Sequence, residues 1–326
     1  MKKILVSIIS ILILSGLVVQ ASDLVIESKT QSFNEKDSKI KFDGNVKVSV
    51  DDLKVVGDNA DVSVTKDQRL DTATFYDKPY AFEIKKNKKR EVKANILKVS
   101  LLTKIIRAEG DTQSIVFDGK TPIVVINSDI QEYNTKTGVM TATGAVTIKY
   151  KDVETFSNIA ELTTDKDGEL KRLVLSGNAS VKQDKDEAYA DRFVYTSSTG
   201  ILTSSGNTTS KAVFENGDKI TIKSNYQEYN QKTSVYNASG NVKIWYDDYF
   251  AQGPKVTLYP NKETNKPNEV YFTGRSSITQ GVRTIFADKI KMVLKPKSFD
   301  AQGNTRTVIK NIGSGSSDED GMSLGL

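Results

Sequence analysis

The chain has 326 residues, with 46 Lys and Arg, 41 Asp and Glu, and neither Cys nor His. Without Cys there can be no disulfides, thiol nucleophiles or lipoprotein signal, and without His there are no imidazole-based metal or acid–base sites. The formal net charge of +5 is too small an excess to make nucleic acid the expected partner.

Residues 1–21 are typical of a signal peptide that is cleaved on export to the periplasm. Lys2 and Lys3 give a charged start, the stretch 4–19 is almost wholly apolar, and Val19-Gln20-Ala21 has the small-x-small form of a cleavage site. The alternative is an inner-membrane anchor, because the apolar run is near the lower limit for spanning a bilayer.

The rest of the chain repeats itself. The stretch 222–253 has a near-copy at 126–157 and a looser copy at 26–57. Turn signals, mostly Gly, recur every 29 to 34 residues from Gly44 to Gly303. This spacing predicts about nine units of about 33 residues, grouped into three repeats of about 97 residues. We expect the repeats to cover residues 22–121, 122–217 and 218–310.

Each unit is predicted to form strands. The segments GNVKVSV, GAVTIKY and GNVKIWY alternate apolar and polar residues, and no segment between 24 and 310 keeps a helical apolar stripe. The fold class is therefore all-β. Alternation places Trp245 on the outer face of its strand. Residues 311–326 are rich in Gly, Ser and acidic residues, which predicts a disordered tail.

The candidate chemistry is sparse. Recurrent carboxylates such as Asp191 and Asp288 follow a small residue at the same step of each unit, which favours a structural role over a catalytic pair. We therefore expect no enzymatic activity, no cofactor and no metal. The basic run 85–90, KKNKKR, indicates a solvated loop between strands, with a patch for lipid-headgroup phosphates as the alternative.

The apolar strand faces leave two interpretations open. Composition favours a fully packed interior. A partly open interior would instead form a groove of lipid size, in which each buried methylene of an acyl chain gains roughly 0.8 kcal/mol.

Three segments of the first repeat carry a family resemblance: Leu24-Val25-Ile26-Glu27-Ser28, Phe42-Asp43-Gly44-Asn45-Val46-Lys47-Val48 and Tyr76-Asp77-Lys78-Pro79-Tyr80-Ala81-Phe82. In this order and spacing they resemble the LptA/OstA-like family of periplasmic lipopolysaccharide-transport proteins. The similarity is clearest over residues 24–112 and weaker to about residue 305. At about three copies of the long repeat, this chain is longer than typical members.

The resemblance implies an elongated, V-shaped β-jellyroll (a β-taco) that shields the acyl chains of lipid A in an apolar groove. It implies lipid contact at Leu24, Ile26 and Phe82. Alignment of the repeats extends the set, and strand alternation completes it, with the further groove residues Val46, Val48, Val124, Ile126, Val146, Ile148, Ile220, Ile222, Val242 and Ile244.

The partners implied by the resemblance are lipopolysaccharide or a similar glycolipid, an inner-membrane LptC-like component and an outer-membrane LptD-like component. Head-to-tail self-association through edge strands is also expected, because a terminal strand leaves backbone groups unpaired. The alternative function is a structural or adhesive β-repeat protein that has a packed core and binds no lipid.

Overall fold

The computed structural model describes residues 25–34, 36–50, 53–85, 88–100, 102–134, 136–165, 169–214, 217–261, 263 and 267–310. The predicted signal peptide, Leu24 and the predicted tail 311–326 lie outside the described residues. The part that is described consists of 22 strands joined by turns, which confirms the all-β prediction. It includes no helix long and apolar enough to cross a membrane.

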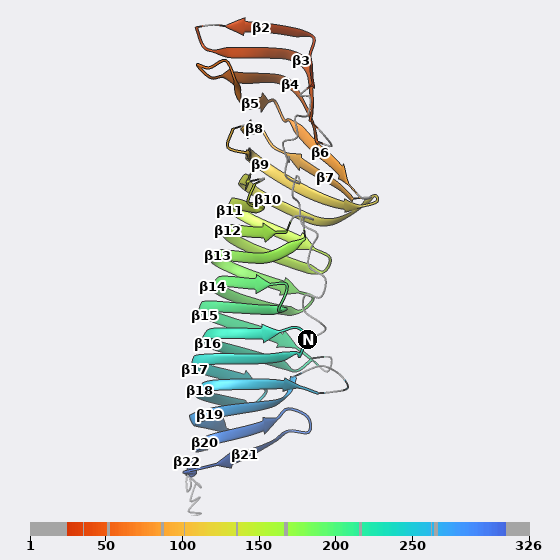
Figure 1. Cartoon of the computed structure of the whole chain (residues 1–326). Coiled ribbons are helices and arrows are strands. Elements are labelled where there is room, and N and C mark those ends of the chain that lie inside the picture. The colour runs from red at the N-terminus through yellow and green to blue at the C-terminus, as the bar shows by residue number, and fades with distance from the viewer. Residues whose placement is uncertain are drawn as a thin grey trace, which may run out of the picture.

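The strands follow one another along the length of the molecule (Figure 1). The first nine are β1 (Val25–Glu27), β2 (Thr30–Asn34), β3 (Lys39–Val50), β4 (Leu53–Val64), β5 (Leu70–Tyr76), β6 (Tyr80–Lys85), β7 (Lys88–Lys93), β8 (Ile96–Ser100) and β9 (Ile105–Asp118). The others are β10 (Thr121–Asn134), β11 (Val139–Tyr150), β12 (Val153–Thr164), β13 (Leu170–Gln183), β14 (Asp186–Thr196), β15 (Ile201–Val213), β16 (Lys219–Asn230), β17 (Val235–Tyr246), β18 (Tyr249–Pro260), β19 (Pro267–Gln280), β20 (Arg283–Val293), β21 (Ser298–Gln302) and β22 (Arg306–Ile309).

All strand pairs are antiparallel, and from β9 to β20 each strand pairs with the next one in the chain. Near the N-terminus the short strands act as halves of long ones. The strands β5 and β6 both pair with β4, while β7 and β8 both pair with β9. At the ends of the sheet, β1 and β2 lie along β3, and β21 and β22 lie along β20.

Each long strand bends in its middle. On β13, Gly177 and Asn178 have φ values of 78° and 48°, and the register slips there because Ser176 pairs with Arg192 while Ala179 pairs with Ala190. This insertion is a β-bulge, which bends a strand. The recurrent Gly positions of the sequence are therefore mostly bends within strands. The spacing of these positions was predicted correctly, but most of them are bends within strands and not turns between strands.

The recurrent Asp or Asn of the sequence lies against the Gly of the next strand. A Cβ atom at Gly206 would lie 2.2 Å from Oδ2 of Asp191. The amide of Asn207 also donates a hydrogen bond to Asp191, at 3.2 Å, and the amide of Asn304 donates one to Asp288, at 2.7 Å. These contacts confirm the structural role predicted for Asp191 and Asp288.

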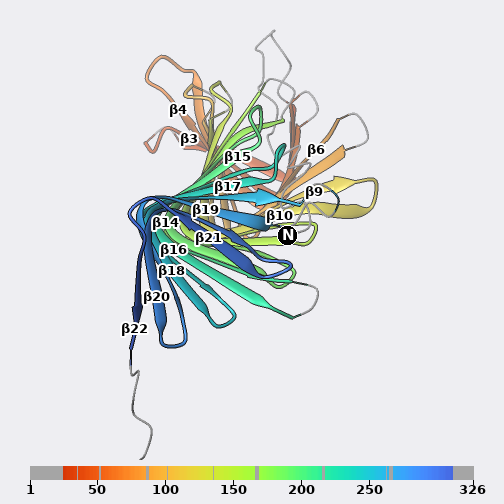
Figure 2. The same ribbon diagram turned by 90° about the horizontal axis from the view of Figure 1, so that it is seen from below.

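Because the bends are stacked, the single sheet folds into two wings that meet along one edge (Figure 2). The inner faces of the wings carry the buried apolar residues, which form one cluster between Phe42 and Tyr195 and a second between Phe214 and Leu294. The hydrogen-bonded sheet continues across residues 121–122, and strand β15 pairs with β16 across residues 217–218. The division into three repeats stays a prediction.

Substitution of Gly206 by Ala tests the bend. Its φ of 74° costs an L-residue roughly 1–2 kcal/mol, and the new Cβ would also collide with Asp191. Gly281 has a φ of 55° but nothing within 4 Å of an added Cβ, so Gly281→Ala is the matched control. In urea unfolding, we expect Gly206→Ala to lower the free energy of unfolding by about 2 kcal/mol more than the control. Equal losses would show that the close approach is unimportant.

Candidate functional site

The two wings present different halves of the same strands to the interior. On β16, Ile220 and Ile222 face inward before the bend at Ser224 and Asn225, and Tyr229 faces inward after it. We call the half that holds Ile220 and Ile222 the first wing and the half that holds Tyr229 the second wing. The interior between them is the candidate site, because both halves of the long strands turn their apolar side chains toward it.

Most of the predicted groove residues are buried on these inner faces. Ile26 and Val48 pair with each other across β1 and β3 and are half-buried against the core. The others on the inner faces are at most 4% exposed, and they are Val46, Val124, Ile126, Val146, Ile148, Ile220, Ile222, Val242 and Ile244. Alternation thus assigned their faces correctly, and it also placed Trp245 correctly on the outer face, where it is partly exposed.

The structure does not place Phe82 on the inner face with the other predicted groove residues. Its neighbour Ala81 belongs to the core, so alternation along β6 points Phe82 outward. There its ring stacks on Tyr80, with the ring centroids 5.4 Å apart, and its cross-strand partner is the exposed Lys54. The ammonium group of Lys89 lies 5.4 Å from the centre of the Phe82 ring.

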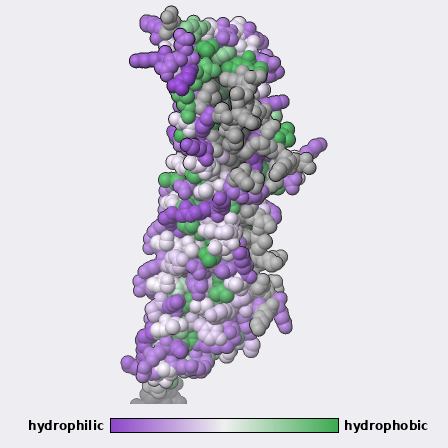
Figure 3. All heavy atoms as spheres, viewed as in Figure 1, coloured by the Kyte–Doolittle hydropathy of each residue, from purple (hydrophilic) through white to green (hydrophobic). Residues whose placement is uncertain are grey.

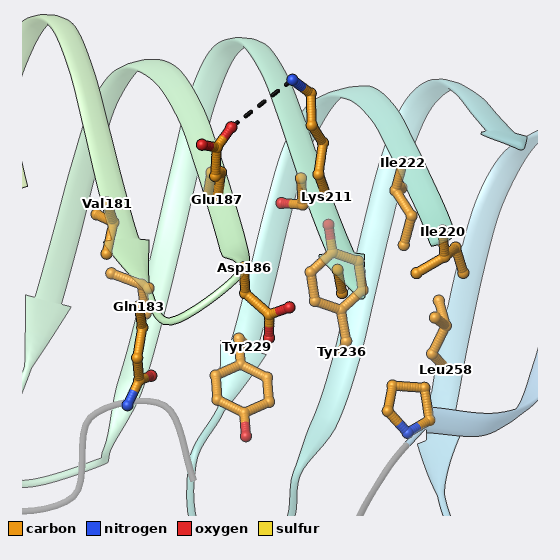
Figure 4. Close-up of a pocket in the computed structure, with 15 residues that line it drawn as sticks. Val181, Gln183, Asp186, Glu187, Lys211, Ile220, Ile222, Tyr229, Tyr236 and Leu258 are labelled. Carbon is orange, nitrogen blue, oxygen red and sulfur yellow. Dashed lines mark ion pairs between the residues drawn. The ribbon is translucent and has the colours of Figure 1, made fainter. Parts of the chain in front are cut away.

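A cavity of about 90 Å³ lies between the two wings, among the strands β13 to β19 (Figure 4). Ala188, Ala212, Ile220 and Ile222 line it from the first wing. On the opposite side are side chains of the second wing, Leu202, Tyr229, Tyr236 and Leu258. The cavity lies where the first apolar cluster gives way to the second.

Sequence reasoning found two of the cavity residues, Ile220 and Ile222, and missed those of the second wing. A signal for one of them was present. Tyr229 belongs to the repeated QEYN segment, which also contains Tyr133. The groove residues predicted from the repeats all lie before the bend, so no inner-face residue was predicted for the half-strands beyond it.

Three polar side chains near the bends of β15 and β16 are hydrogen-bonded. The hydroxyl of Ser210 donates to Oε1 of Gln227 at 2.6 Å, and the Gln227 amide donates to the backbone carbonyl of Ile222 at 3.3 Å. The Thr208 hydroxyl donates to the carbonyl of Ser224 at 2.8 Å. Buried polar groups need such partners, and these bonds tie the two halves of β16 together at the bend.

Burial keeps several tyrosines of the interior neutral. Burial raises the pKa values of Tyr229 and Tyr236 above the ordinary value of 10. Burial, aided by the nearby Asp218, raises the pKa of Tyr246 to about 12. These three side chains are therefore uncharged near pH 7. The charged residues Asp186, Glu187 and Lys211 also line the cavity, and Nζ of Lys211 is 3.7 Å from Oε2 of Glu187 (Figure 4).

The family model of the LptA/(LptD N-terminal domain) lipopolysaccharide-transport proteins matches residues 25–119 and again residues 125–223. These two matches cover more than half of the chain and lie one long repeat apart. The chain therefore belongs to this family of lipopolysaccharide-transport proteins. The bent, antiparallel all-β sheet is the β-jellyroll that the resemblance implied.

Among solved structures, the chain is similar to LptH, the LptA-homologous periplasmic component of the lipopolysaccharide transport device of Pseudomonas aeruginosa. The identity is 11%, the TM-score is 0.33, and the match covers 38% of this chain and 83% of that one. No curated protein matches the chain.

Alkaline unfolding tests the burial of the tyrosines. In the unfolded chain Tyr236 titrates near pH 10, but in the folded chain its pKa is raised, so above pH 10 the folded state binds more protons. The contribution of Tyr236 to the free energy of unfolding is therefore complete below pH 10 and falls above it, by about 1.4 kcal/mol per pH unit for such a group.

Tyr236→Phe should flatten this decline in urea titrations at increasing pH. Tyr259→Phe, on the exposed outer face, is the control. An unchanged slope in Tyr236→Phe would contradict the assignment.

Proposed function

We propose that this chain is a periplasmic carrier or bridge for lipopolysaccharide, which shields the acyl chains of lipid A between its two wings. The observation that carries the proposal is the apolar interior to which both wings contribute, with a void between them lined by Ile220, Ile222 and Leu258. Membership of a lipopolysaccharide-transport family supports the choice of ligand.

The wings need to part for an acyl chain to enter, because the void of about 90 Å³ is small. For much of the sheet the two wings are joined through the bends of the same strands, and the backbone hydrogen bonds run within each wing. Opening the angle at the bends therefore sacrifices side-chain contacts while the sheet stays intact. Each methylene that replaces those contacts contributes roughly 0.8 kcal/mol, so a long saturated chain offsets the loss.

The outer faces suit the polar part of the ligand, since hydrophilic residues outnumber hydrophobic ones among those coloured in Figure 3. Between β11 and β15 they carry a row of paired charges, with Lys149 beside Glu154, and Glu187 beside both Lys182 and Lys211. A glycolipid whose tails lie between the wings would keep its sugars and phosphates in water on this side.

The ends of the sheet are the surfaces for assembly. The terminal strands β1 and β2 pair only with β3 among the described residues, so their other edges keep unpaired backbone groups. Apolar side chains are exposed there, including Phe33 at one end, and Ile309 on β22 at the other. These ends would join the inner-membrane LptC-like and outer-membrane LptD-like components, or a second copy of this chain, by strand addition.

One observation favours the alternative of a structural β-repeat protein with a packed core. Val46, Val124 and Ile126 have no measurable exposure, as expected for side chains that pack permanently against one another. The two functions differ in whether these side chains ever contact a lipid, which crosslinking can decide.

Photo-crosslinking with purified lipopolysaccharide distinguishes them. A photoreactive residue at Ile222 should label the lipid because it faces the cavity, and one at the adjacent Lys223 should not, because it is exposed on the outer face. Ile126 and Val125 form a second inner and outer pair. Labelling from both members of each pair, or from neither, would contradict the carrier function.

Self-association through the terminal strands can be tested with a substitution on β2. Phe33→Lys places a charge on the exposed face of β2 and should shift the chain from oligomer to monomer in sedimentation experiments, because charge on an edge strand opposes pairing. Ile84→Lys is the control, since Ile84 is equally exposed but lies on β6, which pairs on both sides. An oligomer unaffected by Phe33→Lys would exclude this end from assembly.

A further inference from the structure

The cavity between the wings has a smaller counterpart, of about 30 Å³, near β7 to β11. The two are lined by residues 96 positions apart in the chain. Val92, Ile106, Ser114, Tyr133 and Met140 of the smaller cavity correspond in this way to Ala188, Leu202, Ser210, Tyr229 and Tyr236 of the larger one.

The polar supports of the two cavities match as well. The Ser114 hydroxyl donates to Gln131, whose amide donates to the carbonyl of Ile126 at 3.2 Å, as Gln227 does to that of Ile222. The Thr112 hydroxyl donates to the carbonyl of Ser128 at 2.7 Å, as Thr208 does to that of Ser224. The two cavities therefore have the same polar supports. The difference between their volumes must come from a local difference in the residues around them.

An ion pair distinguishes the smaller cavity. On its first wing Glu83 pairs across the strands with Arg90, with Arg90 Nη1 3.6 Å from Glu83 Oε2, and both side chains are buried. Arg90 lies two residues from Val92 on the same face of β7, and Val92 lines the cavity, so the ion pair lies next to it.

The corresponding cross-strand pair of the larger cavity carries no such bridge. There Gln183 pairs with Asp186. Their side chains bond elsewhere, because the Gln183 amide donates to Asp152 at 2.8 Å and Asp186 accepts a hydrogen bond from the backbone N–H of Val213 at 3.0 Å. Ala188 in the larger cavity occupies the position that the bulkier Val92 occupies in the smaller cavity.

We propose that the chain carries two acyl-chain sites one long repeat apart, an open site at Tyr229 and Tyr236 and a second site at Tyr133 and Met140 that the Glu83–Arg90 ion pair closes. The inference rests on the proposed carrier function and adds to it the number and position of the sites. A saturated hydrocarbon tail is the occupant, because both cavities are walled mainly by aliphatic and neutral aromatic side chains. The trough would then hold tails at discrete sites.

Labelling with dodecanoic acid that carries a terminal diazirine tests this proposal. In the unmodified chain, peptide mapping should find label around Tyr229 and Tyr236 and little around Tyr133 and Met140. The double variant Glu83→Gln with Arg90→Ala should add a second cluster of label at Tyr133 and Met140. Native mass spectrometry should show an increase from one bound probe to two per chain.

The control is a second ion pair on the outer face. Lys291 Nζ lies 2.8 Å from Glu269 Oε1, and the double variant Glu269→Gln with Lys291→Ala should leave the labelling unchanged. If the first double variant fails to fold, as judged by near-ultraviolet circular dichroism, Ala188→Phe serves instead. It fills the open site and should abolish the label at Tyr229 and Tyr236 without creating another.

Four results would overturn the inference. Equal labelling of both sites in the unmodified chain would show that the ion pair closes nothing, and a folded double variant without the second cluster would show the same. Label spread evenly along the interior would leave the carrier function standing and remove the two discrete sites. The absence of any label between the wings would overturn the carrier function and the two sites together.

Discussion

The fold depends on a close approach between a Gly in one strand and an Asp or Asn side chain in the next. At Gly144, Gly206 and Gly240, an added Cβ would lie within 3 Å of Asp129, Asp191 or Asn225. Gly is needed at these positions both for its positive φ and for its missing side chain. Since the pair recurs along the sheet, the long strands from β10 to β17 bend at the same place, and one sheet supplies both walls of its own core. Without the bends the inner faces would have nothing to pack against.

The architecture was largely predictable from the sequence, because period and alternation depend on local residues. Val146 and Ile148 could be placed on the inner face from the GAVTIKY segment alone. Three features were not predictable. Phe82 lies outward because Asp77 and Lys78, both with positive φ, break the strand just before it, and alternation restarts beyond the break. Arg90 belongs to a run that reads as solvated, yet its strand turns it inward to Glu83. The cavity depends on the volumes of side chains contributed by seven strands, β13 to β19.

The buried polar residues explain how an apolar trough keeps a defined shape. Gln131 and Gln227 lie at the bend, and each bridges the two wings by donating to a backbone carbonyl. These hydrogen bonds fix the register of the two halves of each strand. Apolar contacts alone would allow the halves to slide. Away from the bend the wings are held together mainly by side-chain packing, with a hydrogen bond from the Tyr246 hydroxyl to the Leu294 carbonyl at 3.4 Å. This division allows the hinge line to stay rigid while the interior exchanges its own side-chain contacts for those of a ligand, which is what a carrier of hydrocarbon tails requires.

If this chain is a carrier, hydrocarbon tails displace side-chain contacts between its wings. The most direct test is a crystal structure of the chain bound to lipopolysaccharide. It should show acyl density between the wings, in contact with Ile222 on one side and Tyr229 on the other, and a wider angle at the bends. Acyl density on the outer face, with the interior packed as it is in the free chain, would contradict the carrier function.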